Sequence, residues 1–202
     1  MSYIIAADEI KKTLPGYTPE NSEAFHRESA ILADKAFEQA LKERPEKTVV
    51  LMAGGSASGK SEYVSAYLEK RKIIILDGTL PTLEGASIKI RKAQKAGKRV
   101  QIHLVLPDSL LVAFIAFLNR ERKFSLEHFY RTHSNSRKTA LAVARLYDDL
   151  DVEVYVSDVD FVGTGSTMSF MHLDFKNRRE LVEFLEQNQY TENEIIKKVF
   201  DT

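Results

Sequence analysis

A short glycine-rich segment in the middle of the chain constrains the fold more than any other feature. Residues 51–64 read LMAGGSASGKSEYV, in which Gly54 is followed by four residues and then by Gly59, Lys60 and Ser61. An apolar run typical of a buried strand precedes the segment, and a stretch with helical character follows it. A strand, a glycine-rich loop of this spacing and a helix form a phosphate-binding loop, so the sequence predicts an α/β fold that holds a nucleotide.

Each part of this segment has a physical role in holding a triphosphate. Glycine at positions 54 and 59 permits backbone conformations and a close approach that a side chain would block, so successive amides can point at phosphate oxygens. We expect Lys60 to bind the β- and γ-phosphates of ATP and the Ser61 hydroxyl to ligate Mg²⁺. The predicted nucleotide-binding residues are Gly54, Gly55, Ser56, Ala57, Ser58, Gly59, Lys60, Ser61 and Glu62.

Short β-rich runs alternate with longer helical stretches along the chain. Strands are predicted at 3–7, 48–53, 72–76, 99–106 and 152–157, and helices at 22–43, 60–71, 84–97, 108–122, 125–147, 176–187 and 191–200. This alternation gives a mostly parallel central sheet covered on both faces. We therefore expect one α/β domain over residues 1–202, a three-layer sandwich of the P-loop NTPase and kinase type. Residues 161–169 are rich in small residues and are expected to form a loop or a weak hairpin.

Charge and composition narrow the range of partners. The chain has 29 lysines and arginines against 29 aspartates and glutamates, so no overall field attracts a polyanion, and a small ligand is favoured over nucleic acid. It has no cysteine, which is consistent with a reducing compartment. Residues 1–10 lack the basic start of a signal peptide, and the apolar run at 110–118 is too short to span a membrane and should form a buried helix. We expect a cytoplasmic protein without a membrane partner.

A carboxylate follows the next apolar strand. Residues 76–81 read LDGTLP, which places Asp77 at the end of that strand. In sheets of this type such an acid lies beside the phosphate loop and can hold Mg²⁺ or its waters, although an aspartate before Gly78 can also simply cap a turn. The Asn-Lys-x-Asp pattern by which GTPases read guanine is absent, which counts against a switch GTPase.

Three segments resemble the zeta-toxin group of P-loop kinases, which phosphorylate small molecules such as UDP-N-acetylglucosamine. GGSASGKSEY resembles the phosphate loop of that family, and residues 73–107 resemble its next block, in which a strand ends in acid-Gly-Thr. Residues 119–133, NRERKFSLEHFYRTH, resemble its arginine-bearing lid, which we place at about 119–137.

One block of the family is missing from its usual place. A strand that ends in the general base should follow the helix of the phosphate loop, but the chain between Ser61 and Ile73 has room for that helix alone. Residues 4–43 resemble the missing block, with an acid, a lysine three residues later, LPGY, and a helix that opens with HRES. The resemblance therefore implies a rearranged chain, whose base-bearing strand lies beside the acid-Gly-Thr strand, on the side away from the phosphate-loop strand.

The resemblance implies a role for two residues of this front block. Asp8 would be the carboxylate that accepts the proton of the acceptor hydroxyl. The alternative for Asp8 is a helix cap, because AADEIKK can begin a helical turn. Lys11 would contact the nucleotide or the phosphates of the substrate, and its alternative is a solvated surface lysine.

Further residues are assigned to the acceptor and to the lid. Thr79, His26, Glu28 and Arg131 are predicted to bind the substrate, against the alternatives of packing for Thr79 and helix-start polarity for His26. Guanidinium groups of the lid would reach the transferred phosphoryl group. The candidates are Arg120, Arg122, Arg131 and Arg137, of which we favour Arg120 and Arg122; the alternative for each is an exposed basic face. Asp158 and Asp160 could contact the base or the ribose, or cap a loop, and His103 is expected to be structural.

The expected function is that of an ATP- and Mg²⁺-dependent kinase that phosphorylates a hydroxyl group of a small molecule. The first alternative is a polynucleotide 5′-hydroxyl kinase, which would need a basic groove. The second is an ATP-binding module without catalysis, which would be favoured by an Asp8 far from the phosphate loop. Enzymes of the resembled family can act as toxins in bacteria. The resemblance therefore implies an antitoxin protein as a partner, which no residue pattern indicates.

Overall fold

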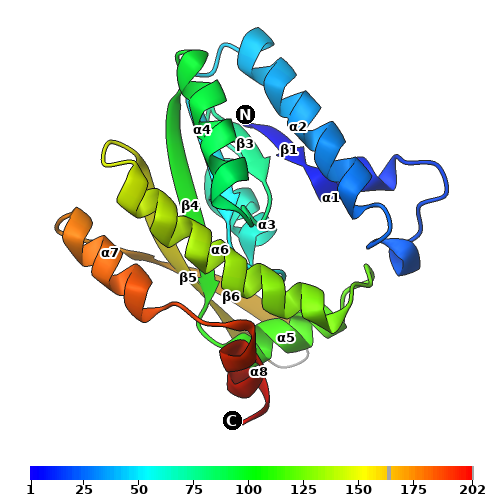
Figure 1. Cartoon of the computed structure of the whole chain (residues 1–202). Coiled ribbons are helices and arrows are strands. Elements are labelled where there is room, and N and C mark those ends of the chain that lie inside the picture. Colours follow the sequence, from blue (N-terminus) through cyan, green and yellow to red (C-terminus); the bar gives the residue numbers. More distant parts are fainter. Residues whose placement is uncertain (163–164, 202) are drawn as a thin grey trace.

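Six strands form one sheet in the order β1-β3-β2-β4-β5-β6 (Figure 1). The computed structural model describes residues 1–162 and 165–201, with the backbone alone at 161, 162, 165 and 166. Strands β1 to β5 run parallel to their neighbours, and β6 pairs antiparallel with β5. The strands are β1 (Tyr3–Ala6), β2 (Thr48–Ala53), β3 (Ile74–Asp77), β4 (Arg99–Pro107), β5 (Asp151–Val162) and β6 (Gly165–Leu173). The predicted mostly parallel α/β sheet is confirmed.

The strand order brings three distant parts of the chain to one edge of the sheet. Strand β1 pairs with β3, with Ala6 opposite Asp77, and β3 pairs on its other side with β2. Because parallel strands end at the same edge, the segments after β1, β2 and β3 are neighbours there. The first strand thus lies on the far side of β3 from the phosphate-loop strand.

One face of the sheet is covered by four helices. These are α2 (His26–Glu43), α4 (Leu83–Lys95), α6 (Leu126–Leu146) and α7 (Arg178–Gln187). Figure 1 shows α4 and α6 lying across this face. Each helix turns an apolar stripe inward, so that side chains such as Phe37, Ile90 and Val143 pack on Leu51 and Ile102 of the sheet.

The opposite face carries the helix of the phosphate loop. That helix begins as α3 (Lys60–Tyr63) and continues as a π-helical turn, η2 (Val64–Leu68). Val64 and Leu68 pack against Val50, Met52 and Ile75, which are the alternate side chains of the central strands. The helix therefore ends three residues earlier than the predicted range 60–71.

Helices α5 (Leu110–Leu118) and α8 (Glu192–Phe200) pack on the start of α6 and form a separate apolar cluster. The predicted helix at 110–118 is present as α5, and it is buried on one side only. Phe114 and Phe117 are buried, but Ile115 and Leu118 are each 47% exposed. Among the described residues, none of the helices is both long and apolar enough to cross a membrane.

The structure adds elements that the sequence patterns did not separate. The predicted helix 22–43 is preceded by a 3₁₀ turn at Pro19–Asn21, and α2 itself begins at His26. A short helix α1 (Ala7–Lys12) follows β1 directly. Of the segment 161–169, the described part forms a hairpin, but its strands extend well beyond that range; residues 163–164 lie outside the described chain. Asp158 and Asp160 lie within β5 rather than in a loop.

Candidate functional site

The phosphate loop has the backbone that its glycines predict. Gly54 and Gly59 have φ angles of +137° and +83°, which glycine adopts without strain. A Cβ atom at Gly54 would lie 2.4 Å from the Val105 carbonyl oxygen, and one at Gly55 would lie 2.2 Å from the His133 ring. The loop is therefore packed too closely against β4 and α6 to accept side chains at these positions.

Contacts from distant elements hold the loop in place. The Ser56 amide donates to Thr132 Oγ1 at 3.1 Å, and the Ser56 carbonyl lies 2.8 Å from His133 Nε2. The Ser157 hydroxyl of β5 donates to the Ser58 carbonyl at 2.9 Å. Thr132, His133 and Ser157 were not assigned to the site from sequence, because no local pattern connects them to a loop more than 70 residues away.

Lys60 is buried in the loop that it serves. Its ammonium group donates to the carbonyls of Gly54 and Gly55 at 3.1 and 2.7 Å. Burial lowers the pKa of Lys60 to about 8, although the charge of Asp77 opposes the shift. The Lys60 ammonium group also donates to the Ser58 hydroxyl at 3.4 Å. A buried cation whose hydrogen-bond partners are all neutral is ready to exchange them for phosphate oxygens, which carry charge.

Ser61 and Asp77 lie beside Lys60, and each has a side-chain oxygen that can act as a metal ligand. The Ser61 hydroxyl donates to Asp77 Oδ2 at 3.0 Å. Burial raises the pKa of Asp77, and the charge of Lys60 acts in the opposite direction. No group of three His, Cys, Asp or Glu side chains within 1–162 and 165–201 could hold a metal by itself. A hydroxyl and a carboxylate suit Mg²⁺, which takes its remaining ligands from substrate phosphates and water.

A cleft of about 900 Å³ joins the phosphate loop to the front of the chain. Its lining includes Lys60, Ser61 and Asp77 together with Asp8 and Arg122. Of the other predicted residues, the cleft is lined by Ser56, Glu62, Thr79, His26 and Arg120. The placement of Asp8 far from the phosphate loop, which would favour a non-catalytic module, is thus not found.

Asp8 lies in the first turn of α1, but it does not cap that helix. The N-cap residue is Ala6, and no side chain bonds to the first free amides of α1. The Asp8 carboxylate instead contacts Lys11 Nζ at 3.2 Å and Arg122 Nη1 at 2.7 Å. Burial raises the pKa of Asp8, but the charges of Arg122 and Lys11 outweigh burial and leave the pKa below its ordinary value. Asp8 is therefore ionised at neutral pH.

Lys11 is not a surface lysine. Its side chain has no exposed area, and its ammonium group lies between Asp8 and the Ser22 hydroxyl, 4.7 Å from the centre of the Phe124 ring. Lys11 does not line the cleft itself. In this arrangement its charge acts on Asp8, whose position and ionised state it supports.

The segment between α5 and α6 provides the two favoured arginines. Arg122 pairs with Asp8, whereas no described carboxylate lies within 4.0 Å of the Arg120 guanidinium. Burial lowers the pKa of Arg120, and the neighbouring charge of Arg122 adds to this effect. Arg120 is thus a partly buried cation at the cleft without a direct anionic partner among the described residues.

The same segment is attached to the front of the chain. The Lys123 amide donates to the Pro19 carbonyl at 2.9 Å, and the amide and hydroxyl of Ser125 both donate to the Glu23 carboxylate at 2.9 Å. The Phe124 ring stacks on His128 with a 4.3 Å separation of ring centres. Glu23 and Phe124 are parts of the site that sequence patterns did not reveal.

Besides Lys11, three of the residues predicted for the substrate or the lid do not line the cleft. Glu28 and Arg131 are exposed and do not line it. Arg137, a third lid candidate, is 3% exposed and lies beneath His133 rather than at the cleft. Because α6 is a regular helix, its arginines point in different directions, and the spacing of basic residues alone could not show which of them faces the site.

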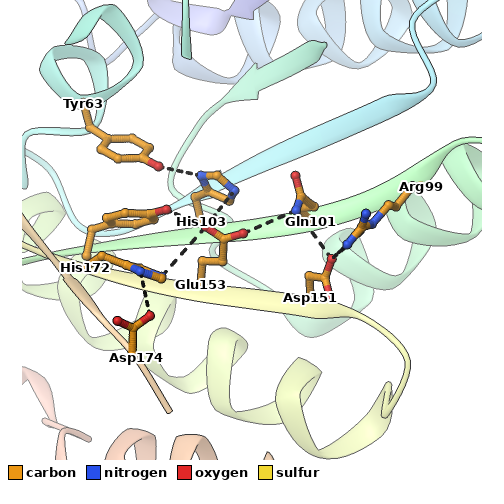
Figure 2. A network of polar contacts seen from close by, with 9 residues as sticks. Tyr63, Arg99, Gln101, His103, Asp151, Glu153, His172 and Asp174 are labelled. Carbon is orange, nitrogen blue, oxygen red and sulfur yellow. Dashed lines mark hydrogen bonds and ion pairs between the residues drawn. The ribbon is translucent and has the colours of Figure 1, made fainter. Parts of the chain in front are cut away.

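Tyr63 attaches the phosphate-loop helix to the sheet. Its hydroxyl lies 2.9 Å from His103 Nδ1 of β4, and burial lowers the pKa of His103 to about 4, so the ring is neutral at pH 7. His103 Nε2 in turn lies 3.6 Å from Glu153 Oε2. Figure 2 shows that this network continues from Glu153 toward His172 on one side and toward Gln101 on the other. The expectation that His103 is structural agrees with this buried position.

The geometry can be compared with known proteins. The model of the family described as Zeta toxin matches residues 63–189, which is more than half of the chain. The matched segment contains Asp77, Thr79 and the segment between α5 and α6, whereas the phosphate loop and Asp8 precede it. No match to this chain was found among curated proteins.

Proposed function

The chain belongs to the zeta-toxin family, and we propose that it transfers the γ-phosphate of ATP to a hydroxyl group of a small molecule. Membership supports a P-loop kinase-like phosphotransferase in general. The observation that carries the finer proposal is the cleft of about 900 Å³, which is lined by both Lys60 and Asp8. A kinase needs its donor and acceptor groups in one shared space, and a cleft lined by both Lys60 and Asp8 supports that arrangement.

The phosphate-loop side would hold the donor. Lys60 would exchange the carbonyls of Gly54 and Gly55 for phosphate oxygens, with little movement of its buried stem. Ser61 and Asp77 would hold Mg²⁺, which neutralises charge on the phosphates when it is bound. Arg120, a cation at the same cleft, would contact the transferred group.

The opposite side would hold the acceptor. Asp8 is ionised and can accept the proton of a hydroxyl group that lies between it and the γ-phosphate. Its Oδ2 atom is engaged by Arg122 at 2.7 Å, so the acceptor hydroxyl must displace or share this contact. Since the Asp8 side chain is already 43% exposed, the carboxylate does not have to move out of a buried position for this exchange.

For the acceptor we propose a nucleotide sugar such as UDP-N-acetylglucosamine. The cleft combines cationic side chains, including Lys12 and Arg122, with the aromatic rings of Tyr17 and Phe124. Cations suit the diphosphate of such a molecule, and aromatic faces suit its base or its sugar ring. Resemblance to the family supports this class of acceptor.

We further propose that residues 4–43 are the base-bearing block of the family in a rearranged position. The family match begins only at residue 63, so it does not include this block. The support comes from topology, because β1 lies beside β3 and on its far side from β2. A strand in that place delivers its terminal acid to the same cleft whether it precedes or follows the phosphate loop in the chain.

The test is transfer of labelled phosphate from ATP, with Mg²⁺, to a panel of nucleotide sugars, nucleosides and RNA 5′ ends. We expect a nucleotide sugar to be labelled, and Asp8→Asn to lower kcat by about 10²–10⁴-fold. ATP should still raise the melting temperature of Asp8→Asn, because the donor side is intact.

Glu9→Gln is the matched control, since Glu9 also lines the cleft but pairs with the exposed Lys12. Its kcat should stay within about twofold of the unchanged chain. If RNA 5′ ends were labelled and nucleotide sugars were not, the proposed acceptor class would be wrong. If Asp8→Asn kept full activity, Asp8 would not be the general base.

A further inference from the structure

A second pocket lies at the ends of β4 and β5, on the side of the sheet covered by α6 and α7. Its volume is about 590 Å³, and none of its lining residues lines the cleft described above. Pro107 and Val156 form its inner wall, Tyr190 and Lys198 come from the C-terminal part of the chain, and Arg137 comes from α6. We call it the Arg137 pocket.

Arg137 is a buried cation that lacks an anionic partner. Its side chain is 3% exposed, and only its Nη1 atom donates within the protein, to His133 Nδ1 at 3.3 Å and to the His133 carbonyl at 3.1 Å. Across the described chain no carboxylate lies within 4.0 Å of it, and its Nε atom is buried without a hydrogen-bond partner. Burial lowers the pKa of Arg137 to about 10, which still leaves the group charged at pH 7. An uncompensated buried charge is costly, and proteins usually pair it.

The remaining charges of the pocket are mixed, with cations in excess. Lys198 Nζ lies 4.5 Å from the centre of the Tyr190 ring, and Arg137 lies 5.2 Å from the same ring. Lys197 also lines the pocket, as do the acidic Asp108 and Asp201. Neither Lys197 nor Lys198 forms an ion pair with a described carboxylate. Together with Arg137 they give the pocket three cations, against two acids, Asp108 and Asp201. A ligand with at least one negative charge would balance it.

His133 connects this pocket to the phosphate loop. A guanidinium group can only donate, so Nδ1 of His133 accepts from Arg137, and the ring proton must be on Nε2. That proton is donated to the Ser56 carbonyl at 2.8 Å. The same ring fills the space beside Gly55, where a Cβ atom would lie 2.2 Å from it. A movement of Arg137 therefore changes the contacts of the loop.

We propose that the Arg137 pocket binds a phosphate-bearing small molecule, distinct from the donor and the acceptor, and that its occupancy acts on the phosphate loop through His133. A phosphate group would supply the anion that Arg137 lacks and would also be reached by Lys198. The volume of about 590 Å³ leaves room for a metabolite larger than phosphate itself, with the Tyr190 ring as one wall. The inference does not depend on which acceptor the kinase uses.

The test measures binding of inorganic pyrophosphate by calorimetry to a Lys60→Ala chain, in which the phosphate-loop lysine is removed. We expect one site to remain, Arg137→Gln in this background to weaken it at least about tenfold, and Lys198→Ala to weaken it about threefold, which lowers its occupancy without abolishing it. Lys35→Ala, which removes an exposed lysine of α2, is the matched control and should leave binding unchanged.

Coupling is read from the backbone amide signals of Gly55 and Ser56 in the same Lys60→Ala chain. They should shift on addition of pyrophosphate, and at a pyrophosphate concentration that only partly fills the site the shift should be up to about threefold smaller with Lys198→Ala. If Arg137→Gln fails to fold, the effect of the surface variant Lys198→Ala on pyrophosphate binding still tests the proposal. Absence of binding to Lys60→Ala, or binding that Lys198→Ala leaves unchanged, would overturn the proposal. Neither result depends on phosphoryl transfer, so a failure here is distinct from a failure of the proposed kinase activity.

Discussion

The two sides of the cleft are built in different ways. The phosphate side, residues 54–62 with Asp77, is one continuous loop and its neighbouring strand end, buried over residues 54–60 and held by glycine geometry. The acceptor side, Asp8 and Lys11 with Glu23 and Arg122, is assembled from the first strand region and the segment before α6. Glu23 and Ser125, which join its parts, are 102 residues apart in the chain.

Because of this difference, the phosphate side is a preformed binding surface and the acceptor side is an adjustable one. The phosphate side is fixed by close packing, and packed interiors tolerate little change in volume. The acceptor side is fixed by ion pairs and side-chain hydrogen bonds that are partly exposed, and such contacts are individually weak and exchangeable. Donor binding should therefore be sensitive to single changes on the phosphate side, whereas the acceptor side should adapt.

The largest effect is expected for Lys60→Ala. This change removes the buried ammonium group that would contact phosphate, and charge-assisted hydrogen bonds of this kind contribute about 2–3 kcal/mol. We expect ATP affinity to fall by about 50- to 100-fold in a calorimetric titration. Lys12→Ala is the control, since Lys12 also lines the cleft but pairs with Glu9 outside the phosphate loop, and a comparable loss there would contradict the assigned roles.

The protonation of Lys60 sharpens the same prediction. Its pKa is about 8 in the free protein, and the negative charge of bound ATP should raise it. Binding at about pH 9 should therefore take up more than roughly half a proton per site, and binding at pH 7 should take up little from Lys60, which is already charged there. Calorimetry in two buffers of different ionisation enthalpy measures this uptake, which should vanish in Lys60→Ala.

The next effect concerns packing of the phosphate side. Gly55→Ala places a methyl group 2.2 Å from the His133 ring, so ring or loop must shift. We expect the free energy of unfolding to fall by about 1–3 kcal/mol, measured by urea denaturation. Gly78→Ala, at a glycine of the cleft with nothing within 4 Å of its Cβ position, should change stability by less than about 0.5 kcal/mol. Equal effects of the two variants would show that the loop is not tightly packed.

The smallest effect is expected on the acceptor side. Arg122→Ala removes an ion pair with Asp8 whose side chains are 24% and 43% exposed. Because solvent screens such a pair, the free energy of unfolding should fall by less than about 1 kcal/mol. The pKa of Asp8, followed by carbon NMR, should rise, since the charge of Arg122 lowers it. Arg91→Ala, on the exposed face of α4, should leave that pKa unchanged.

Local sequence patterns predicted much of the architecture. The central strands carry continuous apolar runs, and the helices carry apolar stripes, so most elements were placed within a few residues. Strand β6 was the main omission, since only a loop or a weak hairpin was expected at 161–169. Strand β6 is rich in small and polar residues, and its strand character depends on pairing with β5. The buried character expected for all of α5 failed for a related reason, since its apolar surface exceeds what α8 and α6 cover.

The candidate site was predictable in part. The glycine spacing located the phosphate loop, and the resemblance of the first block indicated Asp8, whose partner Arg122 was also a favoured candidate. Glu23, Thr132 and His133 were not found, because a residue that contacts the site from a distant element leaves no mark in its own neighbourhood. Arg131 and Arg137 share with Arg122 only their charge and their place in the predicted lid, and the turn of α6 directs them away from the cleft.

The sequence by itself determined the phosphate loop, since its backbone conformation depends on glycines that are close neighbours in the chain. It also determined the period of each strand and helix, because burial repeats at the spacing of the element. Only the tertiary structure decided that β1 lies beside β3, and with it that Asp8 and Lys60 line the same cleft and that Arg137 lies buried against His133. Strand order and helix rotation arise from contacts between residues far apart in the chain, which depend on how all the elements pack together.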